Sequence, residues 1–269
     1  MTIDNRTVET PFDHLGEQTK EFYLRALDIL DDAKVPFVIG GAYALAYHAG
    51  VVRHTKDLDA FLKKEHVQSA ISAFERAGYR TEFTHPHWLA KAYGDPEADA
   101  FIDLIYASGN GVSRVDDEWL ANAVDGDLFG RPVKISPAEE IIWSKSFVQE
   151  RHRFDGADIN HLLLARAEQL DWRRLLRRFG PHYPVLLAHL TLFVYVFPCD
   201  KPRVPDWVFD TLTERLRKEP LGDRICRGTL LSWEQYLPDL REHDLVDARL
   251  APHGNMTPDE IRRWTAAEK

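Results

Sequence analysis

Hydrophobic positions in the first half of the chain follow two periods, one helical and one strand-like. Phe22, Ala26 and Ile29 recur at helical spacing among charged residues, which predicts an amphipathic helix over residues 17–34. A short apolar run then ends at a pair of glycines, which predicts a strand over residues 37–39. The same patterns predict helices over residues 42–48 and 65–77, and strands over residues 58–62, 79–84, 89–93, 100–106 and 132–135. These elements together predict a mixed α/β unit with a small sheet.

After residue 135 the pattern becomes almost entirely helical. Ser136-Pro137-Ala138-Glu139 has the sequence of a capping box with proline at the first helical position. Helices are predicted over residues 138–150, 156–169, 171–179, 184–197, 206–218, 230–241 and 258–267. We therefore expect an α+β protein, with an N-terminal α/β domain over residues 1–135 and a helical domain over residues 136–269.

Composition narrows the class of protein. The 269 residues are 44% hydrophobic and 29% charged, which is typical of a globular chain and excludes wholesale disorder. Two cysteines cannot form a disulfide framework, so a reducing cytoplasm is the expected location. The acidic N-terminus has no apolar run typical of a signal peptide. The most apolar stretch, residues 185–197, is shorter than the roughly 20 residues of a membrane span, so we expect a buried helix and no membrane partner.

The first candidate for chemistry is the acidic pair Asp57 and Asp59. On a strand, alternation directs both carboxylates to one face and Leu58 and Ala60 to the other. Two aligned carboxylates repel each other unless a cation lies between them. Mg²⁺ is the natural cation, because it binds oxygen ligands and is usually held by few carboxylates together with substrate phosphates. A charged strand end without metal is the simpler alternative.

Two further features strengthen the metal hypothesis. Gly40 and Gly41 lie between a predicted strand and a predicted helix, where backbone N–H groups can approach phosphate oxygens. Downstream, Asp103 interrupts an otherwise apolar strand, where an acid is costly unless it is paired or bound to metal. Three carboxylates on neighbouring strands could hold two metal ions for in-line phosphoryl transfer.

This combination resembles the nucleotidyltransferase superfamily of DNA polymerase beta. Its motifs match Gly40 and Gly41, then Asp57 and Asp59 on a strand, then a lone Asp103 on a later strand. The resemblance implies Mg²⁺-dependent transfer of a nucleoside monophosphate from a nucleoside triphosphate to an acceptor hydroxyl, with release of pyrophosphate. It implies two Mg²⁺ ions, with Mn²⁺ as an alternative, held by the three aspartates. The two glycines would cradle the phosphates.

The resemblance continues into the helical half. Residues 136–164 are similar to the corresponding stretch of bacterial minimal and abortive-infection-type nucleotidyltransferases. In that stretch a lysine binds the triphosphate and an acid about a dozen residues later supports the site, which implies these roles for Lys145 and Asp158. From the residues alone, a solvated helix lysine is the favoured interpretation of Lys145. Asp155 is explained as a helix N-cap, and Arg151 could pair with it four residues away.

Basic residues elsewhere are weaker candidates for binding a phosphate or the acceptor. Arg53 precedes the acidic pair and could reach a phosphate or an acceptor. The run Arg173-Arg174-Leu175-Leu176-Arg177-Arg178 is typical of a helix with one apolar and one solvated basic face, although it would be the place for an RNA-binding patch. The net charge of −9 favours a small molecule or a protein as the acceptor over RNA.

Other functional classes share parts of this pattern. Glycosyltransferases also use an Asp-x-Asp motif, but usually without the upstream glycine pair and the third strand acid. A haloacid-dehalogenase-type phosphatase requires Thr or Val where Phe61 stands. The main alternative is a catalytically silent nucleotidyltransferase fold that acts as a binding or toxin–antitoxin-type partner. The acceptor, the nucleotide base and the oligomeric state are left open by the sequence.

Overall fold

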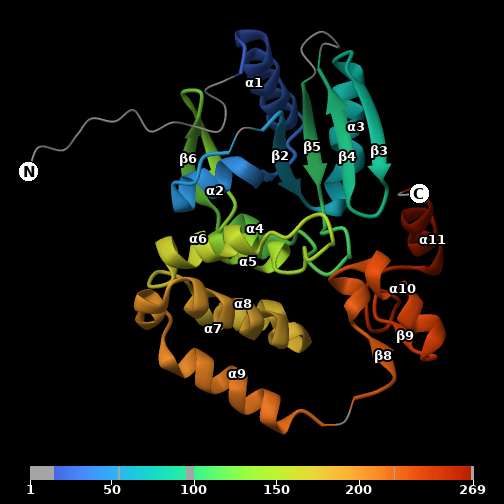
Figure 1. The fold of residues 1–269 in the computed structure, drawn as a ribbon. Helices are drawn as coiled ribbons and strands as arrows, with labels where there is room; N and C mark the ends of the chain where they lie inside the picture. The colour runs from blue at the N-terminus through green and yellow to red at the C-terminus, as the bar shows by residue number, and fades with distance from the viewer. Residues whose placement is uncertain (1–14, 54, 95–99, 221, 268–269) are drawn as a thin grey trace, which may run out of the picture.

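The computed structural model describes residues 15–53, 55–94, 100–220 and 222–267, and is built around one mixed sheet (Figure 1). Its seven strands lie in the order β3-β4-β5-β2-β1-β7-β6. Their bounds are β1 (Phe37–Ile39), β2 (Asp57–Leu62), β3 (Arg80–His85), β4 (Leu89–Tyr93), β5 (Phe101–Ile105), β6 (Val124–Leu128) and β7 (Arg131–Ile135). The expected mixed sheet is confirmed, and it is larger than the sequence indicated.

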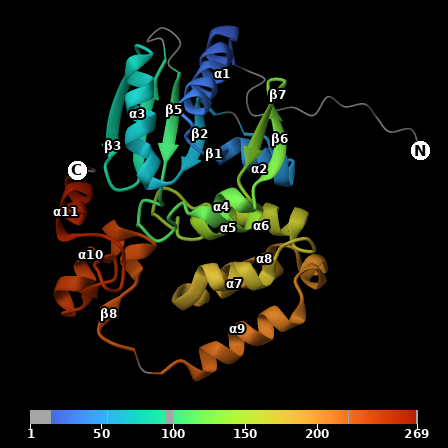
Figure 2. The ribbon, with the colours of Figure 1, turned by 180° about the vertical axis from the view of Figure 1, so that it is seen from behind.

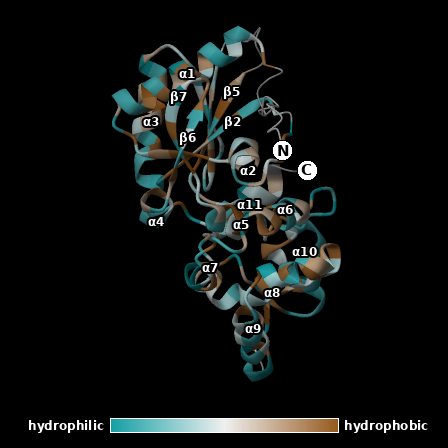
Figure 3. Ribbon diagram, turned by 90° about the vertical axis from the view of Figure 1, so that its left-hand side faces the viewer, coloured by the Kyte–Doolittle hydropathy of each residue, from teal (hydrophilic) through white to brown (hydrophobic). Residues whose placement is uncertain are grey.

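The central strand β2 sets the geometry of the sheet. It runs parallel to β5 and antiparallel to β1, with Asp59 opposite Asp103 on β5. Exposure alternates strictly along β2, and Leu58, Ala60 and Leu62 are fully buried. This is the expected strand alternation, and it leaves both aspartates of β2 on the same face. Figure 3 shows hydrophobic residues on β2 and β5, in the interior of this half of the molecule.

Helices α1 (Glu17–Asp32) and α3 (Val67–Arg76) cover one face of the sheet, as the view from behind shows (Figure 2). Helix α2 (Gly41–Ala49) lies beside the lower part of β2, and α4 (Asp117–Ala121), α5 (Ala138–Lys145) and α6 (Gly156–Arg166) lie below the sheet (Figure 1). A second layer follows, made of α7 (Trp172–Phe179), α8 (Tyr183–Val196) and α9 (Asp206–Lys218). One hydrophobic core runs from the sheet into this layer, from Leu30 and Ile102 through Leu163 to Phe193.

Residues 172–196, which form α7 and α8, have the length and the apolar composition of a membrane-spanning segment. The run is divided at Gly180, where a 3₁₀ turn separates the two helices. Leu175, Phe179 and Phe193 from this run are fully buried in the hydrophobic core. The expectation of a buried helix over residues 185–197 therefore holds for one face of α8, while Tyr195 is 84% exposed.

The C-terminal segment returns to the sheet half of the molecule. It contains α10 (Trp233–Glu242), α11 (Pro258–Ala267) and a two-stranded sheet of β8 (Ile225–Cys226) and β9 (Val246–Asp247). Asn110, in the loop after β5, donates to the carbonyl of Leu230 at 2.7 Å, and Asn255 donates to that of Gly111 at 2.8 Å. The C-terminal segment is thus hydrogen-bonded to the loop that follows β5.

Several predicted elements differ from the structure. Helix α4 and strand β6 were not predicted, and the helix expected over residues 138–150 ends at Lys145. The predicted capping box is wrong: Pro137 occupies the N-cap position, and no side chain caps α5. The reason is that Glu139 accepts the backbone N–H of Asp171 at 2.7 Å and pairs with Arg174 at 2.5 Å. The division into domains at residue 136 stays a prediction.

Candidate active site

Three carboxylates meet on the open face of the central strands. Asp57 and Asp59 come from β2, and Asp103 comes from β5, where it lies directly opposite Asp59. Each side chain offers an oxygen atom, and these atoms all lie within 4.8 Å of one another. Asp57 also accepts a hydrogen bond from the hydroxyl of Thr55. The structure therefore brings together the three aspartates that the sequence singled out.

The glycine pair lies against this cluster. Gly40 donates its backbone N–H to the carbonyl of Asp59 at 3.0 Å. Gly41 begins α2 with a φ of 56°, and a Cβ atom there would lie 1.6 Å from Asp59 Oδ2. At Gly40 a Cβ atom would collide with the ring of Phe61 at 2.2 Å. Both glycines are required by the close approach of the α2 N-terminus to the side chains of β2.

The cluster places three carboxylates together in a partly desolvated site. Burial, together with the neighbouring charges of Asp57 and Asp103, raises the pKa of Asp59 to about 7, against the opposing effect of Lys145 and Lys91. Among the described residues, Asp59 has no ion-pair partner. The same three aspartates raise the pKa of the buried Tyr23 phenol, in addition to burial itself. A site with these properties favours a bound cation.

Lys91 is a component of the site that sequence reasoning missed. It lies on β4 in register with Asp103, and its Nζ is 2.6 Å from Asp103 Oδ1. Burial raises the pKa of Asp103, while the hydrogen bond and the charge of Lys91 lower it. The sequence signal was a lysine in the apolar run Leu89–Tyr93, but only the strand register shows which acid it meets.

A second group of charged residues faces the carboxylates from α5, α6 and the connection between them. Lys145 Nζ lies 2.7 Å from Asp155 Oδ2 and 2.8 Å from Asp158 Oδ2. Arg53 Nη2 lies 2.5 Å from Asp158 Oδ1. Both Lys145 and Asp158, expected at the nucleotide, thus line the same cleft as the aspartates. Lys145 is held in an ion-pair network, so the alternative of a solvated helix lysine is wrong.

The explanation of Asp155 as a helix cap holds for its position but not for its side chain. Asp155 occupies the N-cap position of α6, but its side chain accepts no capping hydrogen bond. Its carboxylate is buried and pairs with Lys145 and with Arg153, rather than with Arg151. Burial would raise the pKa of Asp155, but the charges of Lys145 and Arg153 outweigh it and lower the pKa. Two contacts with cations are more favourable here than one with a backbone N–H.

The cleft between these groups has a volume of about 440 Å³ and changes character along its length. Near the start of β2 it is lined by charged side chains, including those of Arg53 and Asp57. Toward the end of β2 and β5 the lining becomes aromatic and small, with Phe61, Trp88 and the loop after β5. Asp59 and Asp103, which are in register in the middle of β2 and β5, lie between the two ends. The loop at the second end carries Ser108, Gly109 and Ser113 into the lining.

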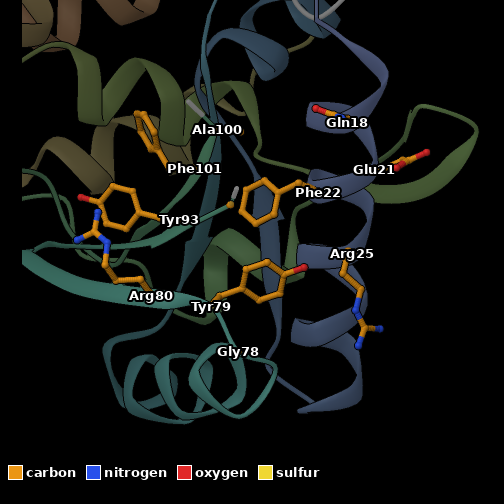
Figure 4. Close-up of a pocket in the computed structure, with 11 residues that line it drawn as sticks. Gln18, Glu21, Phe22, Arg25, Gly78, Tyr79, Arg80, Tyr93, Ala100 and Phe101 are labelled. Atoms are coloured by element: carbon orange, nitrogen blue, oxygen red, sulfur yellow. The ribbon is translucent and has the colours of Figure 1, made fainter. Parts of the chain in front are cut away.

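A larger cavity of about 950 Å³ lies elsewhere, between α1 and the β3–β5 edge of the sheet (Figure 4). Its described lining combines four aromatic rings, Phe22, Tyr79, Tyr93 and Phe101, with the charged residues Glu21, Arg25 and Arg80. Arg80 lies over the ring of Tyr93 at 3.5 Å from the ring centre. The described residues of this cavity hold no group of carboxylates, so volume alone does not identify the site.

The basic helix expected over residues 171–179 has two of its arginines turned inward. Arg174 pairs with Glu139 and approaches Glu140 at 3.6 Å. Arg178 binds Asp116 through both terminal nitrogens, at 2.5 and 2.7 Å. The expectation of a continuous solvated basic face is therefore wrong. These two guanidinium groups are occupied by carboxylates of α5 and of the α4 N-terminus, and only Arg173 and Arg177 remain exposed.

The residues present fit a divalent cation. The chemistry is that of a hard oxygen-donor set, and Asp59 is a largely desolvated carboxylate beside two others. Asp57, Asp59 and Asp103 are the groups that would hold metal. The two backbone glycines and Lys145 surround the same cleft on its other sides.

Known structures with a similar fold are distant. The chain is 23% identical to the antibiotic-resistance factor ANT(2'')-Ia, which aligns over 63% of this chain and 95% of its own, with a TM-score of 0.42. The lincosamide antibiotic adenylyltransferase LnuA is 17% identical, over 55% of this chain and 96% of its own (TM-score 0.38). A nucleotidyltransferase-like protein from Paracoccidioides brasiliensis is 14% identical, over 73% of this chain and 99% of its own (TM-score 0.44).

Comparison with functionally curated proteins gave no match. A protein family described as "Uncharacterised nucleotidyltransferase" matches residues 24–182, which is more than half of the chain. The matched range contains the glycine pair, the three aspartates and both members of the Lys145–Asp158 pair. The chain therefore belongs to this nucleotidyltransferase family and is an enzyme of that type.

Proposed function

We propose that this protein transfers a nucleoside monophosphate from a nucleoside triphosphate to an acceptor hydroxyl, in a Mg²⁺-dependent reaction that releases pyrophosphate. The observation that carries the proposal is the cluster of Asp57, Asp59 and Asp103, whose oxygen atoms lie within 4.8 Å of one another beside the α2 N-terminus. A like-charge cluster of this kind is costly to the fold, and a cation site accounts for it.

Each group has a distinct role in the proposed reaction. Gly41 presents its backbone N–H at the start of α2, and Lys145 places a positive charge, on the triphosphate. The N–H of Gly40 is bonded to the carbonyl of Asp59, so Gly40 contributes by letting the α2 N-terminus approach β2 closely. Two divalent cations held by the aspartates would supply charge neutralisation and alignment for in-line displacement. The acceptor oxygen forms a bond to the α-phosphorus as the bond from that phosphorus to the pyrophosphate oxygen breaks. The hydroxyl proton passes to the carboxylate of Asp103.

The acceptor is best sought among small molecules and proteins. The net charge of −9 opposes phosphate-rich partners, and two of the four arginines on α7 are occupied by internal carboxylates. The described lining of the cleft holds five aspartates against the cations Arg53, Lys145 and Arg153. Both cysteines are free, which is in keeping with a reducing cytoplasm.

Label transfer tests the proposal. Purified protein, Mg²⁺ and each α-³²P-labelled nucleoside triphosphate are incubated with host-cell lysate, and RNA, protein and small molecules are then separated. We expect label in one fraction with the wild-type chain and none with Asp57→Asn. Asp210→Asn, the same chemical change at an exposed position of α9, serves as the matched control and should transfer normally.

The outcomes separate the alternatives. Label lost with Asp57→Asn identifies the reaction and the acceptor class together. Label that persists with Asp57→Asn contradicts the assignment of the site. Stabilisation of the fold by nucleotide without any transfer would favour the catalytically silent binding protein.

A further inference from the structure

One ion pair stands apart from the others in the sheet. Lys91 and Asp103 face each other across β4 and β5, with their side chains only 17% and 11% exposed. Lys91 Nζ also lies 3.9 Å from the centre of the Phe101 ring, which neighbours Asp103 on the same strand face. An ammonium group is strongly hydrated, so placing it here requires a compensating charge.

The sheet contains a second cross-strand Lys–Asp pair, and comparison with it shows that the burial of the Lys91 pair is unusual. Lys134 and Asp125 are in register on β7 and β6 at 2.7 Å, but their side chains are 56% and 89% exposed. Such a surface pair has little effect on stability or on any neighbouring group. The Lys91 pair has the same geometry and residue types, but it lies at the edge of the carboxylate cluster.

The ion pairs of the three aspartates indicate the role of Lys91. Within the described part of the chain, it is the one cation in an ion pair with any of Asp57, Asp59 and Asp103. The cations that line the cleft, Lys145, Arg53 and Arg153, pair with Asp155 and Asp158 instead. Lys91 is therefore the cation that directly contacts the metal-free cluster, with its Nζ 2.6 Å from Asp103 Oδ1.

We propose that Lys91 is the resident counter-ion of this cluster: it stabilises the metal-free site and, by the same charge, lowers its affinity for divalent cations. The inference rests on the proposed metal site. A carboxylate has two oxygens, so Asp103 can keep Lys91 on one while the other faces the cluster. The ammonium group then repels an incoming cation and holds Asp103 in place for it. Lys91 is in this sense a positioning residue, and it sets the cation concentration at which the site fills.

The test measures metal binding and stability without relying on turnover. Mn²⁺ is titrated into the full-length wild type and into Lys91→Met, and free Mn²⁺ is read by its EPR signal. A divalent cation roughly 6 Å from an ammonium group is repelled, even at the dielectric constant of water, by an amount that changes affinity about tenfold. We expect Lys91→Met to bind Mn²⁺ about tenfold more tightly. Its metal-free Tm should fall by about 3 °C, and saturating Mn²⁺ should close that gap.

Three variants separate this role from simple packing. Lys91→Arg keeps the charge and should bind Mn²⁺ as the wild type does. Lys134→Met removes the exposed pair and should change neither measurement. Should Lys91→Met fold poorly, the double variant Lys91→Met/Asp103→Asn still decides the matter, because removing both charges should restore the metal-free Tm.

Failure of this inference is distinct from failure of the proposed function. Equal or weaker Mn²⁺ binding by Lys91→Met, with binding by the wild type intact, overturns the counter-ion role alone. A Tm deficit that Mn²⁺ leaves unchanged also overturns it, because a packing defect would behave in that way. Absence of Mn²⁺ binding by the wild type overturns both the metal site and the role of Lys91.

Discussion

Two clusters of charged side chains, one between α4, α5 and α7 and one on β2 and β5, differ in how their carboxylates are paired. In the network between α4, α5 and α7, every carboxylate contacts a guanidinium group: Glu139 and Glu140 contact Arg174, and Asp116 contacts Arg178. In the cluster on β2 and β5, Asp59 contacts no cation within the described chain, and two other carboxylates lie beside it. The first arrangement joins helices together. The second keeps negative charge available, and this is the arrangement that points to function.

The two clusters also respond differently to burial. Burial raises the pKa of Glu140 to about 7 even though Arg174 and Arg178 both lower it. For Asp59, like charges add to the effect of burial instead of opposing it. Removing a cation should therefore damage the first cluster, whereas removing an acid should relieve the second.

Replacing the uncompensated acid should abolish activity and stabilise the fold. Asp59→Asn should reduce transfer by at least about a hundredfold, because a cation ligand is lost. The pKa of Asp59 is raised in the folded protein, so its ionisation costs stability that is lost as pH rises from about 4 to about 7. At about pH 8 the variant should therefore melt higher than the wild type without metal. A lower Tm for Asp59→Asn, measured by calorimetry, would contradict this account.

Removing a cation from the network of α4, α5 and α7 should have the opposite effect on stability. Arg174→Met leaves Glu139 and Glu140 buried without that partner and should reduce the free energy of unfolding by about 3 kcal/mol. Arg177→Met, three residues along the same helix and exposed, should change it by less than about 0.5 kcal/mol. Denaturant titration measures both. Similar values for the two variants would show that the network adds nothing to stability.

The glycine beside the acidic cluster gives a smaller, local test. Gly41→Ala combines a left-handed backbone with a Cβ atom 1.6 Å from Asp59 Oδ2, and should cost about 2 kcal/mol together with most of the transfer activity. Gly50→Ala has a similar φ of 67° but open space around it, so only the backbone cost of about 1 kcal/mol applies. The difference between the two variants reports the contact with Asp59. Equal losses would mean that this contact is easily relaxed.

Mild acid should destabilise the helical layer through a buried histidine. Burial, with a contribution from Arg227, lowers the pKa of His182 to about 4. The unfolded chain binds this proton near pH 6.5 and the folded chain only near pH 4, so stability should fall as pH falls through that window. His182→Phe keeps a ring against Phe147 and should flatten this part of the pH profile. An unchanged slope between about pH 6.5 and pH 4 would assign the acid sensitivity to other groups.

The sequence was informative where local pattern and chemistry coincide. Strand alternation placed Asp57 and Asp59 on one face, and the cost of an acid in an apolar strand drew attention to Asp103. The glycine pair was recognised from its position between a strand and a helix, although its physical reason, the approach of Asp59 and Phe61, is visible only in three dimensions.

The sequence could not predict which charged residues of distant elements form ion pairs with one another. Lys91 meets Asp103 because of strand register, and Asp155 leaves its capping role because Lys145 and Arg153 are near. Arg174 and Arg178 were expected in solvent because helical periodicity shows a polar face but does not show the acids of α4 and α5 that cover it. Short elements such as α4 and β6 have too few residues for a clear period.

The hydrogen bonds from the loop after β5 to the C-terminal segment have a consequence for synthesis. Ser108, Gly109 and Ser113 of this loop line the cleft. Asn110 and Gly111 of the same loop are bonded to the carbonyl of Leu230 and the side chain of Asn255, which lie more than a hundred positions later in the chain. A ribosome delivers the glycines, the aspartates and Lys145 well before it delivers those partners. The loop at this end of the cleft is therefore among the last parts of the molecule to gain its hydrogen-bond partners, after the carboxylates have been synthesised.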